Sequence, residues 1–510
     1  MTEADLDKIM QMSSVAIIAP AGHGKTEMIA EIVKHTEGKQ LLLTHTNAGV
    51  DAIEKRLQKR KVSKEKYTVT TIAAFCIKWC VSYNGTGEFD KALSPLNSAK
   101  EAKTYYAQLY SGAKKIFATS WVGNVLKASY AGIIVDEYQD CIQVQHEIFL
   151  AMNKHLPVRV LGDPMQGIFS FAGDLVDWNN LEFPIVDVET KPWRWSKCNP
   201  ELGEYLMTVR DNLLPILSKQ SCKVQIAPKN ENVEIIAPAA FTGYSHLKEL
   251  SQYSSVVYIT KWPRQQLNFC SRMPGIFQYD EKQDCDELFK YAEQFDMKVG
   301  ADLALEVIKF AVECSTGVVK ELKSYIEKLK INSFDFARIK KHTDFRDILT
   351  ETAPNLTKET VFRMLEWFSK NAEFKQYRSE LLSEMMRSIK YAIDHDTTIY
   401  DAANHIRKDV GLQKRYTGFK FLSSRTLLSK GLEFDCVIID MTTPLSAKDF
   451  YVAMTRAMRK YISYQILIPL YFVPNKSTPP VANEWCTQLF SYCYSSMTSS
   501  IILAPSLKLF

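Results

Sequence analysis

The segment that most constrains the fold of this chain runs from Ala19 to Thr26 and reads APAGHGKT. It follows the apolar run 15–18 and precedes a helical pattern of apolar residues over 28–33. A small-residue loop between a buried strand and a helix presents backbone N–H groups, to which the helix N-terminus adds partial positive charge. The alternative is a Gly-rich turn placed here by chance, and the flanking strand and helix argue against it. The segment therefore predicts a phosphate-binding P-loop.

This loop predicts a nucleotide site that also holds Mg²⁺. We expect its N–H groups to surround the β- and γ-phosphates, the Lys25 ammonium to neutralise them and the Thr26 hydroxyl to bind the metal ion. The expected nucleotide-binding residues of this segment are Ala21, Gly22, His23, Gly24, Lys25, Thr26 and Glu27.

A second chemical signal is the acidic end of an apolar run. Residues 132–135 read GIIV and are followed directly by Asp136 and Glu137. Ligands of open α/β sheets bind at the carboxyl ends of the strands. In P-loop enzymes one carboxylate at this place holds Mg²⁺ and another orients the attacking water, so we assign Asp136 to the metal and Glu137 to the water. The alternative, a solvated acidic strand end, is disfavoured by the P-loop upstream.

The composition indicates a large globular chain. Its 510 residues are 46% hydrophobic and 24% charged, which suits several domains with buried cores. With a net charge of +5, any binding of nucleic acid would depend on local basic surfaces. No apolar run has the length of a membrane span and no cleavable leader opens the sequence, so we expect a cytoplasmic protein without a membrane partner. The eleven cysteines lack paired C-x-x-C spacing and predict neither a zinc site nor disulfides.

Alternating strand and helix patterns predict parallel sheets covered by helices on both faces. The expected strands lie at residues 15–18, 40–44, 67–71, 132–135, 158–161, 233–236, 256–260 and 437–439. Long helical patterns without an intervening strand lie at residues 301–314, 318–329, 358–370 and 381–393.

A series of motifs occurs in order between residues 19 and 460. They are APAGHGKT, LLLTHTNAGVDAIEKRL, TTIAAF, IIVDEYQD, VLGDPMQGIFSFAG, KPWRWS, LLSKGLEFDCVII and DFYVAMTRAMRK. In this order, the chain resembles the superfamily 1 DNA helicases of the UvrD/Rep/PcrA group. The resemblance implies an α/β fold of two RecA-like parallel-sheet P-loop cores with helical accessory insertions. It also implies hydrolysis of ATP with Mg²⁺ and 3′ to 5′ movement on single-stranded or partly duplex DNA.

The same resemblance implies roles for individual residues. Gln166 is similar to the residue that senses the γ-phosphate, and Arg194 and Arg456 are similar to arginines that contact it from the second core. Trp193 occupies the position of an aromatic that stacks on adenine, and Glu433 that of a ribose-binding glutamate. The residues expected to act in catalysis are therefore Lys25, Glu137, Gln166, Arg194 and Arg456. The residues expected to contact DNA are His45, Thr46, Asn47, Thr71, Phe75 and Phe171.

The resemblance also suggests how the chain is divided. The expected units are the first core at 1–80 and 131–181, its insertion at 81–130, the second core at 182–283 and 412–475, its helical insertion at 284–411, and a tail at 476–510.

Two other functions stay open from the sequence. The same fold could act as a DNA- or nucleotide-sensing NTPase that gates a partner nuclease without processive unwinding. The compact size and short insertions resemble the helicase component of Gabija-type anti-phage systems, in which a nuclease is the companion. A DNA-binding scaffold without enzymatic activity is disfavoured, because the residue types of an NTPase site are all present.

Overall fold

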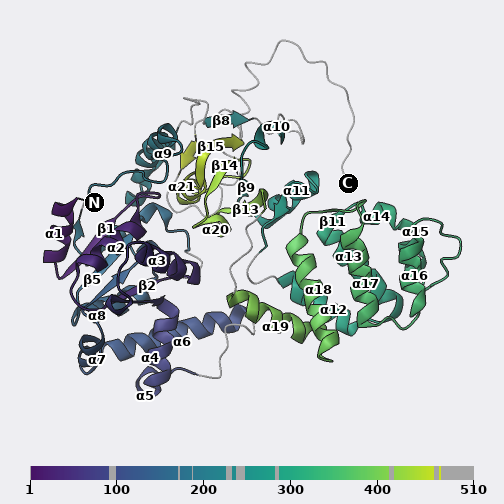
Figure 1. The fold of residues 1–510 in the computed structure, drawn as a ribbon, viewed down its shortest axis with the longest axis horizontal. Helices are drawn as coiled ribbons and strands as arrows, with labels where there is room; N and C mark the ends of the chain where they lie inside the picture. The colour runs from purple at the N-terminus through teal and green to yellow at the C-terminus, as the bar shows by residue number, and fades with distance from the viewer. Residues whose placement is uncertain are drawn as a thin grey trace, which may run out of the picture.

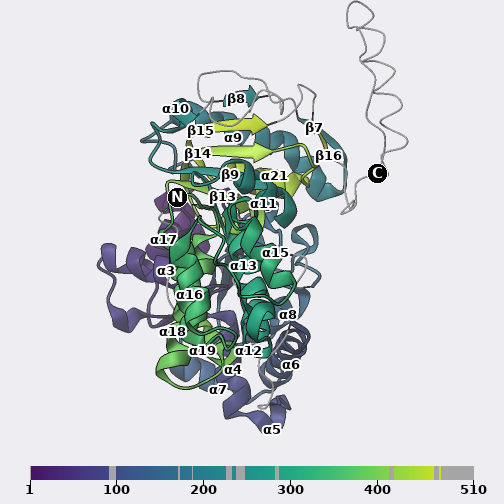
Figure 2. The same ribbon diagram turned by 90° about the vertical axis from the view of Figure 1, so that its right-hand side faces the viewer.

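The computed structural model describes residues 2–90, 99–169, 173–186, 188–224, 233–236, 247–281, 286–412, 419–464 and 470–472. Two predicted features, Phe171 and the tail at 476–510, lie outside the described residues. Two six-stranded sheets and a separate group of helices make up the fold (Figure 1). Figure 2 shows the second sheet at the top, with the group of helices below it.

The first sheet is parallel and has the strand order β3-β2-β4-β5-β1-β6. Its strands are β1 (Ser14–Ile18), β2 (Gln40–Thr44), β3 (Tyr67–Thr71), β4 (Gly132–Val135), β5 (Val158–Gly162) and β6 (Ile185–Val186). The predicted strands of this sheet are confirmed to within one residue at their ends. β6 pairs with β1 beyond residue 181, so the first sheet extends past the boundary expected for the first core.

Helices cover both faces of the first sheet, which is why its strands read as continuous apolar runs. One face packs against α1 (Glu3–Gln11), α2 (Lys25–His35) and α3 (Asn47–Lys59). The other face packs against α4 (Ile72–Ser82), α6 (Ala99–Phe117), α7 (Val122–Ser129) and α8 (Gln143–Asn153). Between α4 and β4, the described residues form only the helices α5 (Asn84–Gly87), α6 and α7, as the sequence predicts for this segment.

The second sheet is also parallel and has the strand order β10-β13-β9-β14-β15-β8. Its strands are β8 (Val233–Ile236), β9 (Val256–Thr260), β10 (Gln278–Tyr279), β13 (Phe421–Arg425), β14 (Phe434–Asp440) and β15 (Ala457–Tyr464). α9 (Pro200–Leu213) and α21 (Ala447–Met454) pack on one face, and α10 (Leu247–Leu250) and α11 (Pro263–Arg272) pack on the other. An antiparallel pair, β7 (Cys222–Val224) and β16 (Leu470–Phe472), lies beside α9.

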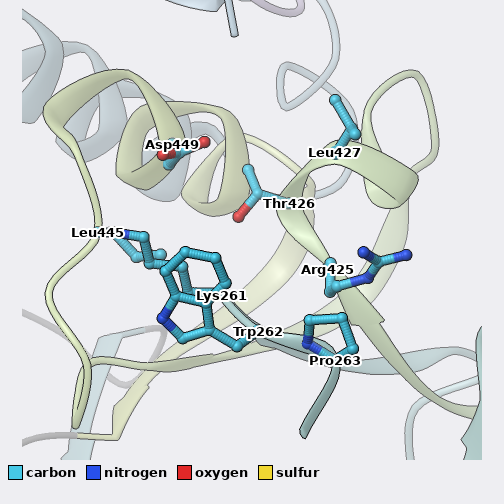
Figure 3. A pocket seen from close by; sticks show the side chains of 8 residues that line it. All are labelled: Lys261, Trp262, Pro263, Arg425, Thr426, Leu427, Leu445 and Asp449. Atoms are coloured by element: carbon cyan, nitrogen blue, oxygen red, sulfur yellow. The ribbon is translucent and has the colours of Figure 1, made fainter. Parts of the chain in front are cut away.

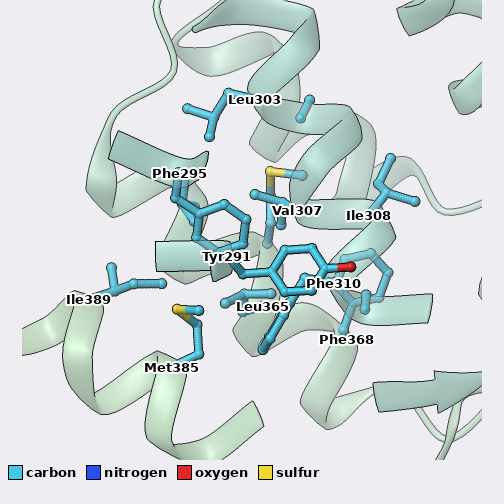
Figure 4. Packing of buried hydrophobic residues seen from close by; sticks show 14 of the residues in the cluster. Tyr291, Phe295, Leu303, Val307, Ile308, Phe310, Leu365, Phe368, Met385 and Ile389 are labelled. Carbon is cyan, nitrogen blue, oxygen red and sulfur yellow. The ribbon is translucent and has the colours of Figure 1, made fainter. Parts of the chain in front are cut away.

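A helical region lies between β10 and β13 in the sequence. Its helices are α12 (Asp286–Met297), α13 (Gly300–Cys314), α14 (Val318–Glu321), α15 (Lys323–Lys330), α16 (Thr343–Glu351), α17 (Lys358–Lys370), α18 (Ser379–Asp394) and α19 (Ile399–Leu412). They enclose one apolar cluster, in which aromatic side chains such as Phe310 and Phe368 interleave with aliphatic ones (Figure 4). This cluster is separate from the clusters around the two sheets, so the region has a hydrophobic core of its own.

Two details of the helical region differ from the prediction. The single helix expected at 318–329 is two helices, α14 and α15, which meet at Leu322. The strands β11 (Ser315–Thr316) and β12 (Lys375–Gln376) form an antiparallel pair where no strand is expected. Two residues are too few to produce a readable strand period, and neither segment has an apolar alternation.

Candidate nucleotide site between the two sheets

The P-loop connects β1 to α2. Gly22 and Gly24 have φ angles of +73° and +82°, in the left-handed region that favours glycine. A Cβ atom on Gly22 would lie 2.8 Å from the Cβ atom of Arg194 and 2.8 Å from the ring of Trp195. Because α2 begins at Lys25, the N–H groups of its first turn are available to an anion. The loop therefore has the backbone of a phosphate cradle, and the turn at residues 193–195 lies directly over it.

Two predicted nucleotide contacts, His23 and Glu27, have protein partners in this structure. The His23 Nδ1 atom lies 2.9 Å from the Ala21 carbonyl oxygen, and burial lowers the pKa of this imidazole. The Glu27 carboxylate accepts a 2.7 Å hydrogen bond from Arg56 and also contacts Arg60. Both side chains thus brace the P-loop and the first turn of α2.

The two carboxylates predicted at the end of β4 lie next to Lys25. The Lys25 Nζ atom is 3.9 Å from a Glu137 carboxylate oxygen, and the Glu137 N–H donates to Asp136 Oδ1 at 2.9 Å. Burial, followed by the charge of Glu137, raises the pKa of Asp136 to about 7. For Glu137, burial is outweighed by Lys25 and Lys430, which lower its pKa to about 2. The two lysines therefore favour the charged form of Glu137, and its φ of +53° lies in the left-handed region, away from the strand conformation.

The expected Mg²⁺ site can be tested on the residues present. Thr26, in the first turn of α2, and Asp136, which is 6% exposed, offer a hydroxyl and a carboxylate. These hard oxygen donors are the type that Mg²⁺ binds, usually together with substrate phosphates and water. The raised pKa of Asp136 reflects a buried carboxylate that lacks a full cationic partner, which fits a cation-binding role. The residues therefore fit the ion, which when bound would neutralise charge on the phosphates.

Asp163, after β5, joins the P-loop to both sheets. This side chain is fully buried, and its Oδ2 atom accepts hydrogen bonds from the Ala21 N–H at 3.1 Å, from Gln166 at 3.1 Å and from the Tyr451 hydroxyl at 2.8 Å. Its Oδ1 atom accepts from Arg210 at 3.3 Å. Tyr451 belongs to α21 of the second sheet, so one carboxylate fixes the loop, the predicted sensor and the second sheet together.

Two arginines bring positive charge to this place. Arg456 lies between α21 and β15 and is 2% exposed. Its Nη2 atom donates to Gln166 Oε1 at 3.4 Å. Burial, followed by the charge of Arg194, lowers the pKa of Arg456 to about 9. The Arg194 N–H donates to the Gly22 carbonyl oxygen at 3.1 Å, while its guanidinium donates to the Thr455 carbonyl oxygen at 2.7 Å. The structure thus brings together Lys25, Glu137, Gln166, Arg194 and Arg456.

The two residues predicted to hold the base and the ribose differ in availability. Trp193 is 57% exposed, and its ring lies 3.3 Å from where a Gly24 Cβ atom would be. Its aromatic face is therefore next to the P-loop and accessible to a base. The Glu433 carboxylate lies 2.7 Å from Arg194 Nε, so in this state it is paired with the arginine.

The prediction missed a second link between the sheets. Lys430, which follows α20 (Thr426–Ser429), donates to both carboxylate oxygens of Asp140 at 2.7 and 2.5 Å and to the Gln166 carbonyl oxygen at 2.7 Å. Its ammonium also lies 4.7 Å from the ring centre of Phe169. Both charged residues lie inside motifs already noted, IIVDEYQD and LLSKGLEFDCVII, but nothing in the sequence indicates that they meet.

The residues predicted to contact DNA differ in how exposed they are. Thr46 and Asn47 are exposed at the start of α3, and Thr46 caps this helix by accepting from the Gly49 N–H. Thr71 caps α4 in the same way, and His45 lies half-buried with Nε2 3.5 Å from the sulfur of Cys141. Burial, then the charge of Lys430, lowers the pKa of His45 to about 4, so its ring is neutral at neutral pH.

The DNA contact predicted for Phe75 is corrected by the structure. Phe75 is 6% exposed and stacks on Phe117 with ring centres 5.8 Å apart, inside the cluster beneath the first sheet. Phe75 lies on the face of α4 that packs against α6. Its ring could therefore meet a base only if this packing were broken. Phe171 lies outside the described residues.

A pocket of about 370 Å³ lies at the carboxyl ends of β9 and β13, and the prediction did not include it. Figure 3 shows its lining, which includes Lys261, Trp262, Arg425 and Thr426. Trp262 is 51% exposed and precedes α11, while Lys261 lies 5.3 Å from its ring centre. An exposed aromatic ring in a pocket that two cationic side chains also line suits a ligand with flat rings and negative charge.

Comparisons with known proteins agree with a P-loop core. A family described as "AAA domain" matches residues 2–172, which include the P-loop, Glu137 and Gln166. No curated protein matches the chain. Among solved structures, the PRRSV helicase aligns with 12% identity and a TM-score of 0.34, covering 94% of this chain and 58% of that one. The Arterivirus nonstructural protein 10 (helicase) in complex with DNA aligns with 11% identity and a TM-score of 0.33, covering 91% and 63%.

The chain thus spans less than two thirds of the length of these viral helicases. Within the described residues, no helix combines the length and the apolar character needed to cross a membrane. The two parallel sheets, with a P-loop and an acidic strand end on the first, give the chain an α/β fold with a P-loop core.

Proposed function

We propose that this chain is an ATP- and Mg²⁺-dependent DNA helicase or translocase of the UvrD-like group, moving 3′ to 5′ on single-stranded DNA. The observation that carries the proposal is the contact of Arg456, from the second sheet, with Gln166 beside the P-loop of the first. A nucleotide between the sheets would meet charge from both. Binding and hydrolysis would then change how the sheets sit against each other, which is what a motor needs.

The residues at the site suggest a division of chemical work. Lys25 and the P-loop N–H groups would hold the phosphates, while Thr26 and Asp136 would hold the metal ion. Glu137, which lies 3.9 Å from Lys25, would orient and polarise the attacking water. Arg194 and Arg456 would stabilise charge that grows on the γ-phosphate in the transition state. Gln166 lies between Asp163 and Arg456, so it would report the state of the phosphate to both sheets.

The nucleic acid would run along the carboxyl ends of the strands in both sheets. On the first sheet, Thr46 and Asn47 offer polar groups at the end of β2. On the second sheet, Trp262 would stack on a base, and Lys261 and Arg425 would contact phosphates. Lys430 supports the link between the two functions, since it contacts Gln166 next to the nucleotide and lies over Phe169 in the same loop.

The test is steady-state ATP hydrolysis with and without single-stranded DNA, together with strand separation on duplexes that carry a 3′ or a 5′ overhang. We expect DNA to stimulate hydrolysis and only the 3′-overhang substrate to be unwound. Lys25→Ala is the control that should remove hydrolysis in all conditions. Hydrolysis that DNA does not stimulate would favour the NTPase that gates a partner nuclease, and no hydrolysis by the intact chain would overturn the proposal.

A further inference from the structure

Three segments of the helical region bring two carboxylates and an imidazole together. Glu321 ends α14, His342 directly precedes α16, and Glu373 lies between α17 and β12. The His342 Nε2 atom is 3.7 Å from an oxygen of Glu321 and 3.7 Å from an oxygen of Glu373. All three possible ligand atoms lie within 4.8 Å of one another. The set is unrelated to the P-loop and belongs to a region with its own hydrophobic core.

The imidazole is held in place and lacks a partner for the nitrogen that faces the carboxylates. The His342 side chain is only 8% exposed, and its Nε2 atom is buried without a hydrogen bond to any described residue. The ring packs edge-on against Trp367 with centres 5.3 Å apart. The Tyr325 hydroxyl lies 2.8 Å from the carbonyl oxygens of both Lys341 and His342, which fixes the backbone here. A buried ring nitrogen without a partner is costly, so an unexplained one points to a missing ligand.

A cationic group already occupies the space between the carboxylates. The Lys341 ammonium contacts the Glu321 carboxylate and lies 3.4 Å from that of Glu373. The Lys341 side chain is 57% exposed, so it can turn into solvent without unpacking the region. Lysine has only donors, and His342 Nε2 has no hydrogen-bond partner among the described residues. A metal ion would satisfy all three groups, whereas the ammonium satisfies two.

We propose that Glu321, His342 and Glu373 bind a divalent transition metal of the Zn²⁺ type. Zinc takes imidazole nitrogen at about 2.0–2.1 Å and carboxylate oxygen at about 2.0–2.2 Å, which places tetrahedral ligands roughly 3.3–3.5 Å apart. The two separations from His342 Nε2 are 3.7 Å, and all three ligand atoms lie within 4.8 Å of one another, so the ligands must draw in, which the half-exposed Glu373 side chain permits. Mg²⁺ and Ca²⁺ are excluded as the preferred ions, because they favour all-oxygen sites. Water completes the fourth position.

The site would fasten three segments of the helical region to one another. Glu321 and Glu373 lie a few residues from β11 and β12, whose pairing brings their two segments together. His342 adds the segment before α16, which reaches these two through the ring contacts of Trp367 and Phe374. The bound ion would therefore join three segments that are far apart in sequence.

The experiment uses the full chain, freed of metal with a chelator and then titrated with Zn²⁺ against a fluorescent zinc indicator. We expect one tight site in the native chain and its loss in His342→Asn, since asparagine tolerates the φ of +54° at this position. The affinity should fall by more than the roughly 10–100-fold that loss of an outer partner costs. His35→Asn is the matched control, because His35 lies 4.0 Å from Glu31 on an exposed helix face and should not change the titration.

Two further measurements test the same site, one of zinc affinity in a second variant and one of the absorption of bound Co²⁺. Lys341→Met removes the competing ammonium and should tighten zinc binding, and Co²⁺ in the native chain should give the visible absorption of a tetrahedral ion. Circular dichroism of each apo variant checks that it is folded. Equal zinc stoichiometry in the native chain and in folded His342→Asn would overturn the proposal. An unchanged or weaker affinity for zinc in folded Lys341→Met would also overturn the proposal, because the Lys341 ammonium would then not compete with a metal ion for the two carboxylates.

Discussion

The loops that follow β1 and β9 occupy comparable places in two parallel sheets and differ in almost every side chain. Each follows an interior strand and leads into a helix, α2 in the first sheet and α11 in the second. The loop after β1 has two left-handed glycines and exposes backbone N–H groups. The loop after β9 has Lys261, Trp262 and Pro263, and it lines a pocket of about 370 Å³.

The difference teaches that the loop, rather than the sheet, decides which ligand the edge can take. Because Gly22 and Gly24 have no side chains, a phosphate can approach the backbone, and the loop itself offers no ring on which a base could stack. At Trp262 the side chain itself is the binding surface, and Pro263 at the first position of α11 removes one of the N–H groups that an anion would use. One edge thus suits phosphates of a nucleotide and the other suits a stacked base. The two sheets are alike in topology but complementary in chemistry.

The largest expected effect tests whether the second sheet completes the first sheet's site. Arg456→Ala should reduce ATP turnover by about 10³–10⁵, the value of an arginine that stabilises transition-state charge, while ATP binding falls modestly. Turnover and nucleotide affinity are measured on the same preparation, with the melting temperature as a check on folding. Arg459→Ala is the control, because its side chain is 61% exposed and lies 3.4 Å from Asp435. Normal turnover in the Arg456 variant would mean that the first sheet works alone.

A somewhat smaller effect separates the two carboxylates on the first sheet. Glu137→Gln should lower hydrolysis on the order of 10²–10⁴, the usual value of a general base, and should leave ATP binding intact. Asp136→Asn should instead raise the Mg²⁺ concentration needed for half-maximal binding of nucleotide. Nucleotide affinity measured across a Mg²⁺ titration distinguishes them. If Glu137→Gln shifts the Mg²⁺ dependence and Asp136→Asn does not, the two roles are reversed.

The third prediction concerns an aromatic that belongs to the core of the first sheet rather than to its edge. Phe75→Ala should destabilise the protein by roughly 3–5 kcal/mol, because it empties a well-packed position against Phe117. The fraction that stays folded should bind single-stranded DNA with normal affinity. Urea unfolding and a DNA titration below the transition give both quantities. Weak DNA binding by a fully stable variant would restore Phe75 to the DNA surface.

The smallest expected effects come from two tryptophans tested against each other, Trp193 beside the P-loop and Trp262 at the edge of the second sheet. Trp262→Ala should weaken single-stranded DNA binding by about 1–3 kcal/mol without changing its salt dependence, because stacking releases no counterions. Trp193→Ala should weaken ATP binding and leave DNA binding without nucleotide unchanged. Each variant serves as the control for the other, since both rings are more than half exposed. A loss of both affinities in either variant would break the division between the two edges.

Much of the fold could be predicted because its signals are local. The strands β2, β3 and β4 have the expected bounds, since continuous apolar or β-branched runs between helices are typical of buried parallel strands. The P-loop and the acidic end of β4 were equally readable, because each pairs a chemical group with a strand end. The roles assigned to Trp193, Glu433 and the DNA-binding residues other than Phe75 stay predictions.

What could not be predicted depends on contacts between distant segments. Lys430 and Asp140 are 290 positions apart, and only the packing of the two sheets brings them together. Phe75 looks available in a motif, yet the direction of α4 sends its ring into the core. His342 lacks any local pattern that would single it out, because its neighbours Glu321 and Glu373 come from other segments of the chain.

The buried Asp163 carboxylate has a consequence for how separation of the two sheets can be followed in solution. The backbone N–H of Ala21 lies 3.1 Å from both Asp163 and the Tyr451 hydroxyl, which come from different sheets. When the sheets move apart, this amide loses one acceptor and gains access to water. Its deuterium uptake therefore reports opening at a single backbone position, and slower uptake with bound nucleotide would show that the nucleotide holds the two sheets together, without any attached label.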